Sequence, residues 1–430
     1  MKTPLLKELP ELVQAGIIPQ ETADKISDYY LNQRTPSQNR IVIAFGILGA
    51  ILVGLGIILI IAHNWDEFPR MVKTGFAFLP LVAGQIVCGF TLMKKRGSIA
   101  WVESATAFLF FAVGASISLV SQVYNIPGNL TSFLFTWMLL CLPLIYVMNS
   151  SIASLLYLIG ITYYACESGY WSHPATESYW YWILLLLALP HFVRLHRKQP
   201  EGNFMIFHNW LVPLSLLTAL GTVAESTEEL MFIAYMSLLG LFYLFGSSEF
   251  FSEQKRRSNG FFIISSVGTI GMLLAFSFDW FWKMLARSNL RYREVVSSPE
   301  FYASAIITLV ALGFLFRQMK NQPLREIKPL GVVFLVFIVT FIMGLSSITL
   351  PLIIINLLAL AIGVLTIRSG AQADHLGILN FGLLIITALV VCRYFDSDLS
   401  FVAKGILFVS VGLGFFFSNY LMLKKRKAHE

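Results

Sequence analysis

Residues 41–62, IVIAFGILGAILVGLGIILIIA, decide the fold, and residues 63–73, HNWDEFPRMVK, close this stretch. The first segment is an uncharged apolar run of about 22 residues, which is long enough to cross a bilayer as a helix. Within it, Gly46, Ala50 and Gly54 recur every four residues. Small residues at this spacing let a second helix approach closely, so this face is predicted to pack against a partner helix.

Similar apolar runs recur along the 430-residue chain, which is 57% hydrophobic and only 13% charged. A soluble domain usually carries about 25% charged residues. Because the runs are continuous and do not alternate every second residue, they indicate helices and not a transmembrane barrel. We therefore predict an all-α polytopic transmembrane bundle of about fourteen spans. After the first span, the predicted limits are 74–93, 101–124, 131–148, 150–166, 178–193, 209–224, 229–246, 260–282, 300–316, 330–346, 350–367, 376–392 and 401–422.

The basic residues test this threading, because cytoplasmic loops of membrane proteins carry an excess of Lys and Arg. With the N-terminus in the cytoplasm and strict alternation, about three quarters of the 31 Lys and Arg residues fall inside. Both termini are therefore predicted to be cytoplasmic. The net charge of +7 is then a topology signal that faces anionic membrane lipid, and no nucleic-acid partner is expected.

One outside loop, at about 283–301, breaks this pattern because it carries four basic residues. It is predicted to be an amphipathic helix on the outer membrane surface. An error in the threading nearby is the alternative.

The two ends of the chain differ from the bundle of residues 41–423. Residues 1–40 predict two short helices separated by Gly16, with Leu9 on the apolar face of the first and Ala23 on that of the second. Helices of about three turns are unstable alone in water, so they are expected to pack on each other, on the bundle or on a partner. This cytoplasmic hairpin is interpreted as a cap on the bundle, and a module that docks a protein partner is the alternative. Residues 424–430 form a basic cytoplasmic tail.

Three span exits place aromatic residues beside an acid at the predicted outer boundary: 63–67, 278–282 and 394–396. Aromatic rings favour the membrane interface, so anchoring is one interpretation. The other is that Asp66, Asp279 and Asp396 line an outward-facing crevice. Lys283 follows Asp279 by four residues, which also predicts a simple ion pair.

The third span has a polar outer half, with Ser116, Ser118, Ser121 and Gln122. In lipid these side chains need partners and are expected to face other helices. Tyr124 ends this span, and it forms a candidate polar site with Gln122. The candidate substrate-binding residues are Trp65, Asp66, Gln122, Tyr124, Asp279, Arg393 and Asp396.

Charged residues are placed near predicted span ends, as in Glu103 and Asp279, and His191 lies near the inner end of the sixth span. This pattern argues against a secondary transporter that works through a carboxylate at mid-membrane. The sequence has no HExxH, GxSxG or P-loop motif, and its four cysteines form no CxxC pair. We expect no enzymatic activity, no catalytic residue, no cofactor and no metal.

The chain resembles a known family over roughly its first 150 residues. The resemblance rests on QAGIIPQETADKI (14–26), GILGAILVGLGIILIIAHNWDEFPR (46–70), GASISLVSQVYNIPGN (114–129) and TWMLLCLPLIYVMNS (136–150). These motifs are similar to the bacterial predicted membrane proteins called domain of unknown function 2157. The resemblance implies a multi-pass protein of the bacterial inner membrane, and it implies no activity or site residue.

Two functions are weighed. The first is a transport-like protein that binds or moves an amphipathic or lipid-linked solute, with membrane lipids around it and Asp66, Asp396, Gln122 and Tyr124 in its site. The alternative is a membrane scaffold or envelope-stress component that docks a protein partner through residues 1–40.

Overall fold

The computed structural model describes residues 4–32, 38–63, 68–171, 176–288, 290–321, 329–394, 400–402, 405–406, 408–410, 412–414, 416 and 420. In this part of the chain the structure is 86% helical and contains no strand, which confirms the all-α prediction. The chain divides into two compact units. Unit 1 holds Met1–Asn129 and Leu140–Ala153, and unit 2 holds Leu130–Leu139 and Ser154–Glu430.

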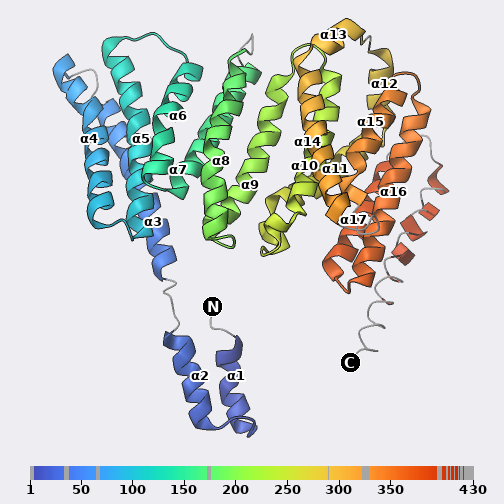
Figure 1. The fold of residues 1–430 in the computed structure, drawn as a ribbon, viewed down its shortest axis with the longest axis horizontal. Helices are drawn as coiled ribbons and strands as arrows, with labels where there is room; N and C mark the ends of the chain where they lie inside the picture. The colour runs from blue at the N-terminus through green and yellow to red at the C-terminus, as the bar shows by residue number, and fades with distance from the viewer. Residues whose placement is uncertain are drawn as a thin grey trace. The chain divides into compact units, whose positions relative to one another are not determined.

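Unit 1 contains the helices of the N-terminal third (Figure 1). They are α1 (Pro4–Gln14), α2 (Gln20–Asn32), α3 (Gln38–His63), α4 (Arg70–Lys94), α5 (Ile99–Tyr124) and the second part of α6 (Leu130–Val147).

The N-terminal hairpin has the two predicted helices, which lie side by side in Figure 1. Gly16 lies between them with a φ of 67°, in the left-handed region that glycine adopts without strain. Leu9 and Ala23 are both buried, as expected for residues on the two facing apolar sides. The hairpin therefore forms from its own apolar residues.

The partner of the first apolar run is α5. A Cβ atom placed on Gly46 would lie 2.7 Å from Ser104 Oγ of α5, whereas one on Gly49 or Gly56 would meet no described atom within 4 Å. At Gly46 the backbone of α3 therefore lies close to a side chain of α5. The side chain of Ala50 and the surroundings of Gly54 lie outside the described residues.

Helices α4 and α5 also pack closely. A Cβ atom on Gly84 would lie 3.0–3.3 Å from Leu109. Ser116 Oγ donates a 2.6 Å hydrogen bond to the Ala77 carbonyl across the same interface. Small residues and one buried hydroxyl therefore join these helices, as expected for packing inside a membrane.

Unit 2 contains the remaining helices. After the first part of α6 they are α7 (Ser151–Cys166), continued by a π-helix (Glu167–Trp171), α8 (Trp180–Lys198), α9 (Asn203–Leu220), α10 (Met231–Gly246), α11 (Gly260–Phe276), α12 (Asp279–Arg287), α13 (Tyr292–Ser297), α14 (Pro299–Asn321), α15 (Val333–Gly344), α16 (Thr349–Gln372) and α17 (Leu376–Tyr394). Short 3₁₀ turns connect several of them, including η6 (Glu249–Phe251) and η7 (Arg256–Ser258).

The core of unit 2 is aromatic and joins α10, α11, α12, α15 and α16. Phe276 and Phe337 stack with ring centroids 4.9 Å apart, and Phe281 lies 4.5 Å from Phe276. Trp282 is fully buried in the same cluster. Close van der Waals packing of these large rings helps to hold the unit together.

The predicted span at 260–282 is wrong at its C-terminal end. The helix breaks after Phe276, and the next helical segment, Trp280–Arg287 of α12, is bent by 73° from α11. Trp282 Nε1 donates a 2.8 Å hydrogen bond to the Phe276 carbonyl, and Asn356 Nδ2 donates one of 3.1 Å to the Ser277 carbonyl. These donors satisfy carbonyls that the break frees.

The predicted basic loop at 283–301 contains the second half of α12, all of α13 and the start of α14. Helix α12 is amphipathic, since it buries Phe281, Trp282 and Leu285 and exposes Asp279 and Lys283, but it begins before the predicted loop and ends at Arg287. Phe281 and Trp282 belong to the aromatic residues predicted at the outer boundary, and for these two residues the interpretation as membrane anchors is wrong. The amphipathic spacing of α12 places the side chains of Phe281 and Trp282 in the core of unit 2.

Each of the first thirteen predicted spans coincides with a helix, α3 to α11 and α14 to α17. Among the described residues, eight helices are long and apolar enough to cross a membrane, or nine if α11 and α12 count as one bent span. Helices α7 and α15 have only 16 and 12 residues, and α8 ends in His196, Arg197 and Lys198. The chain is therefore a membrane protein with multiple apolar helices.

Candidate functional site

The candidate residues of unit 1 that the structure describes are Gln122 and Tyr124. The Tyr124 hydroxyl lies 3.2 Å from Thr74 Oγ1, and the Arg70 guanidinium lies 5.5 Å from the centre of its ring. Gln122 is exposed, as is Ser118, so the expectation that both face another helix is wrong for these two. Helix geometry explains this, because residues two positions apart point to nearly opposite sides of a helix. Ser116 faces α4, so Ser118 and Gln122 lie on the other side of α5, which is exposed. Trp65 and Asp66 lie outside the described residues.

The candidate residues of unit 2 that the structure describes are Asp279 and Arg393. Asp279 forms the predicted ion pair with Lys283, and both side chains are about half exposed. Arg393 Nη2 donates a 3.3 Å hydrogen bond to Ser277 Oγ, and its guanidinium lies 4.7 Å from the centre of the Phe278 ring. Arg393 thus contacts the two residues that precede Asp279. Asp396 lies outside the described residues.

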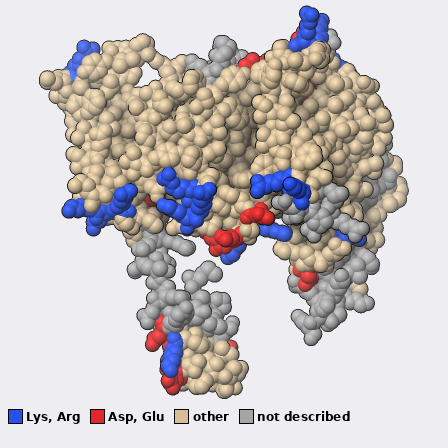
Figure 2. Space-filling view, viewed as in Figure 1, with Lys and Arg blue, Asp and Glu red and all other residues tan. Residues whose placement is uncertain are grey.

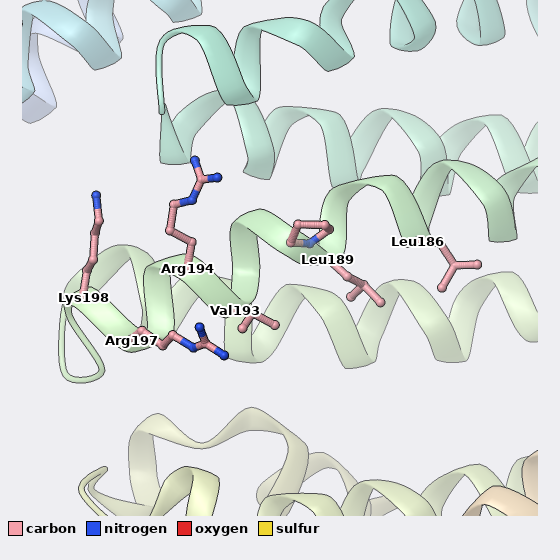
Figure 3. A pocket seen from close by; sticks show the side chains of 7 residues that line it. Leu186, Leu189, Val193, Arg194, Arg197 and Lys198 are labelled. Carbon is pink, nitrogen blue, oxygen red and sulfur yellow. The ribbon is translucent and has the colours of Figure 1, made fainter.

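A different site is present on α8, where an open groove of about 610 Å³ follows one face of the helix (Figure 3). Its lining residues recur with helical spacing, so they share one face. They are Leu186, Leu189, Pro190, Val193, Arg194, Arg197 and Lys198.

The lining of the groove changes from apolar to positively charged along the helix. Figure 3 shows Arg194, Arg197 and Lys198 at one end of this helix, with Arg194 and Lys198 extending to one side and Arg197 to another, while Leu189 and Leu186 follow farther along. None of the seven lining residues is acidic. Over α8, Figure 2 shows the same polarity, with Lys and Arg gathered at the Lys198 end and uncharged surface beyond it. The groove therefore offers an apolar track that leads to a cluster of three cations.

The opposite face of α8 is buried and carries His191, which is 2% exposed. Its ring centre lies 6.0 Å from that of His208 on α9. His208 Nδ1 lies 2.7 Å from the Phe204 carbonyl, which can only accept, so this nitrogen carries a proton. In the neutral ring Nε2 is then an acceptor, and Ser154 Oγ donates to it over 2.9 Å. His208 is fully hydrogen-bonded, whereas neither ring nitrogen of His191 has a partner among the described residues.

His196 lies at the basic end of α8, beyond the predicted span. Its ring stacks on Phe250 of η6, with centroids 3.5 Å apart. Burial lowers the pKa of His196 from its ordinary value, and the nearby Glu253 carboxylate opposes this shift. His196 is therefore mostly neutral at neutral pH, and the positive charge at this end of the groove comes from Arg194, Arg197 and Lys198.

The described part of the chain shows no site for metal or thiol chemistry. It contains no group of three or more His, Cys, Asp or Glu side chains that could hold a metal ion. The four cysteines are free thiols, and Cys88 and Cys141 are buried between helices. In such surroundings a thiol acts as a small apolar side chain.

Comparison of the chain with known protein families agrees with the resemblance described above. No curated protein and no solved structure matches the chain. The α8 groove lies outside the part that matches a family. Residues 10–154, about a third of the 430 residues, match the family described as Predicted membrane protein (DUF2157).

Proposed function

We propose that this membrane protein binds an anionic phospholipid in the α8 groove. The observation that carries the proposal is the order of the lining residues, four apolar ones followed by three cations. An acyl chain along Leu186 and Val193 would gain van der Waals contacts with the apolar side chains, and a phosphate at Arg194 and Arg197 would accept charge-assisted hydrogen bonds. The side chain of Arg suits a phosphate because its planar donors match two oxygens at once.

The proposed threading agrees with such a ligand. We propose fourteen spans in the bacterial inner membrane, with both termini in the cytoplasm. The Lys198 end of α8 would then meet the cytoplasmic leaflet, whose anionic lipids attract basic residues. Basic residues at a span end are also expected from the positive-inside rule alone, so the test must separate a specific groove from general surface charge.

The test is calorimetric titration of the detergent-solubilised protein with dihexanoylphosphatidylglycerol, using dihexanoylphosphatidylcholine as the neutral lipid. The variant Arg194→Gln, Arg197→Gln, Lys198→Gln should bind phosphatidylglycerol at least about tenfold more weakly, because it loses hydrogen bonds from three cations. The matched control is Lys94→Gln, Lys95→Gln, Arg96→Gln, which removes the same charge from the end of α4, and its affinity should not change. Equal losses in both variants would attribute binding to net charge and contradict the proposed site.

The apolar half of the groove has its own test. Leu186 is 62% exposed, so the larger side chain of Leu186→Trp can occupy the groove without disturbing the core. This variant should weaken binding of phosphatidylglycerol. Leu214→Trp, at an exposed position on α9, is the control. Wild-type affinity in both variants would show that the acyl chain lies elsewhere.

We propose further that the protein moves its ligand, with candidate outer residues in each unit: Trp65, Asp66, Gln122 and Tyr124 in unit 1, and Asp279, Arg393 and Asp396 in unit 2. The test is exchange of fluorescent phosphatidylglycerol between leaflets of proteoliposomes. Alanine at Asp66, Asp396, Gln122 and Tyr124 together should slow this exchange while groove binding persists. Exchange equal to that of empty liposomes would reduce the function to lipid binding.

A scaffold is the second candidate, because α1 and α2 form a hairpin that closes on its own buried residues, while Ile17 at its turn is 67% exposed. Deleting residues 1–35 distinguishes the two functions. Loss of a co-purifying protein with an intact bundle favours the scaffold, and unchanged lipid binding with no lost partner favours the groove.

A further inference from the structure

We propose that His191 is a proton-binding site whose protonation is coupled to occupation of the α8 groove by an anionic headgroup. The proposal rests on the proposed function, since it assigns a regulation to the same groove. His191 is the residue after Pro190 and three residues before Arg194, both of which line the groove. It therefore sits on the same helix turn as the ligand site while its ring faces the interior.

The hydrogen bonding of His191 is unusual for a structural residue. Both ring nitrogens are buried without a partner among the described residues, although His208 next to it is fully satisfied. An unsatisfied buried polar group destabilises a fold, so packing alone does not explain a histidine here. Ionisable side chains inside a membrane usually have a functional role.

Buried polar atoms for which the structure describes no partner also occur on the segments that pack near the basic end of α8. Four more buried polar atoms on neighbouring segments lack a partner among the described residues: His196 Nδ1 on α8, Asn209 Oδ1 on α9, and Ser247 Oγ and Gln254 Nε2 at the two sides of η6. Asn209 Nδ2 donates to Gln254 Oε1 over 2.7 Å, which links α9 to the segment after η6. Buried water is the usual partner of such atoms, and a hydrated seam here would connect solvent with the helix end.

Electrostatic interactions would couple protonation of His191 to binding of an anionic headgroup in the groove. Arg194 and Lys198 follow His191 by three and seven residues on the same helix, so their positive charges lie near it and oppose a further one, as would a protonated His208, whose ring centre is 6.0 Å away. Glu253 after η6 acts on His196. A phosphate held by Arg194 and Lys198 neutralises these cations, so His191 accepts a proton from solvent more readily when the groove is occupied. By linkage, a lower pH must then tighten lipid binding, by at most about tenfold per pH unit for one proton.

The experiment measures protons taken up on binding. Wild-type protein is titrated with dihexanoylphosphatidylglycerol at pH 5 and at pH 6, because a buried histidine titrates below its ordinary range, and at each pH in two buffers that differ in ionisation enthalpy. The phosphodiester keeps its single charge in this range, so any uptake belongs to the protein. The heat difference between the buffers should show net proton uptake in the wild type, which requires no variant to fold.

Variants then locate the proton. His191→Leu and His191→Gln should still bind the lipid but take up no proton, and their affinity should no longer rise at lower pH. His375→Gln, at an exposed position between α16 and α17, is the control and should behave as the wild type. No uptake in the wild type overturns the coupling, as does uptake that survives both His191 variants or disappears in His196→Gln. A wild type that does not bind overturns the proposed function itself, and this result is distinguishable because no binding heat is seen.

Discussion

At the scale of single residues, Glu103 of α5 makes the most demanding contacts in unit 1. Its carboxylate is buried and accepts hydrogen bonds from Ser150 Oγ, from Ser151 N over 3.0 Å and from Ile152 N over 2.9 Å. The two backbone donors belong to the first turn of α7, where N–H groups have no partner within the helix. A negative charge is also favoured at a helix N-terminus.

Replacing this carboxylate should destabilise the protein. Glu103→Gln keeps the size but offers only one accepting oxygen, so at least one buried donor loses its partner. The free energy of unfolding is expected to fall by about 1–3 kcal/mol. Unfolding in detergent measures this, with Ser118→Ala as the control, because Ser118 lies exposed on the same helix. Equal effects of the two substitutions would show that the Glu103 contacts contribute nothing.

The contrast between Glu103 and Asp279 shows which contacts can be predicted from a sequence. Lys283 lies four residues after Asp279, and helical spacing alone brings the pair together. The partners of Glu103 lie 47 to 49 residues away, and their proximity depends on how α5 packs against the turn before α7. The α8 groove is similar, since the spacing of its residues is visible in the sequence, whereas the hollow depends on packing.

At the scale of elements, the first apolar helix tests the predicted small-residue face. Gly46→Leu should destabilise the packing of α3 on α5 by about 1–3 kcal/mol, because its side chain must displace Ser104. Gly56→Leu makes the same change where a Cβ atom meets no described atom within 4 Å, and it should have little effect. Thermal unfolding of both variants in detergent is the measurement. Similar midpoints would mean that the face of Gly46 tolerates a large side chain.

At the bend between α11 and α12, the neighbouring residues Trp282 and Asp279 are expected to contribute very differently to the free energy of unfolding. Trp282 is fully buried, and a Cβ atom on Gly344 would lie 2.8 Å from its ring, so Trp282→Ala should cost about 3–5 kcal/mol. Asp279→Asn breaks only an exposed ion pair and should cost less than about 1 kcal/mol. Unfolding in detergent compares the two. A large effect of Asp279→Asn would instead indicate that the carboxylate has a further role.

Helices and their order could be predicted because each apolar run carries its own signal. Segment 260–282 shows the limit of that signal, since its composition stays apolar across the break at Ser277. The bend depends on donors from Trp282 and from Asn356, which lies 79 residues after Ser277. A hydropathy average over neighbouring residues contains no information about hydrogen-bond partners elsewhere in the sequence. For the same reason the sequence predicted Phe281 at the membrane interface, although the fold buries it.

At the scale of the whole molecule, the sidedness of the chain remains a prediction from its basic residues. Ser258 follows Arg256 and Arg257 in a segment predicted inside, and Ser288 follows α12 in the basic loop predicted outside. Between them α11 is predicted to cross the membrane once, and the helical segment that follows it is bent by 73° at the end predicted to be outside. The two serines are therefore expected on opposite sides, even though both neighbourhoods are basic.

Cysteine labelling decides this prediction. In a background with Cys88, Cys141, Cys166 and Cys392 replaced by Ala, a membrane-impermeant maleimide should label Ser288→Cys in intact cells. It should label Ser258→Cys only after the cells are permeabilised. The reverse pattern would invert the threading of this part of the chain, and labelling of both from outside would mean that α11 does not span. Because Arg194, Arg197 and Lys198 are assigned to the same side as Ser258, the first result places the cations of the groove at the cytoplasmic leaflet, where anionic lipid is enriched.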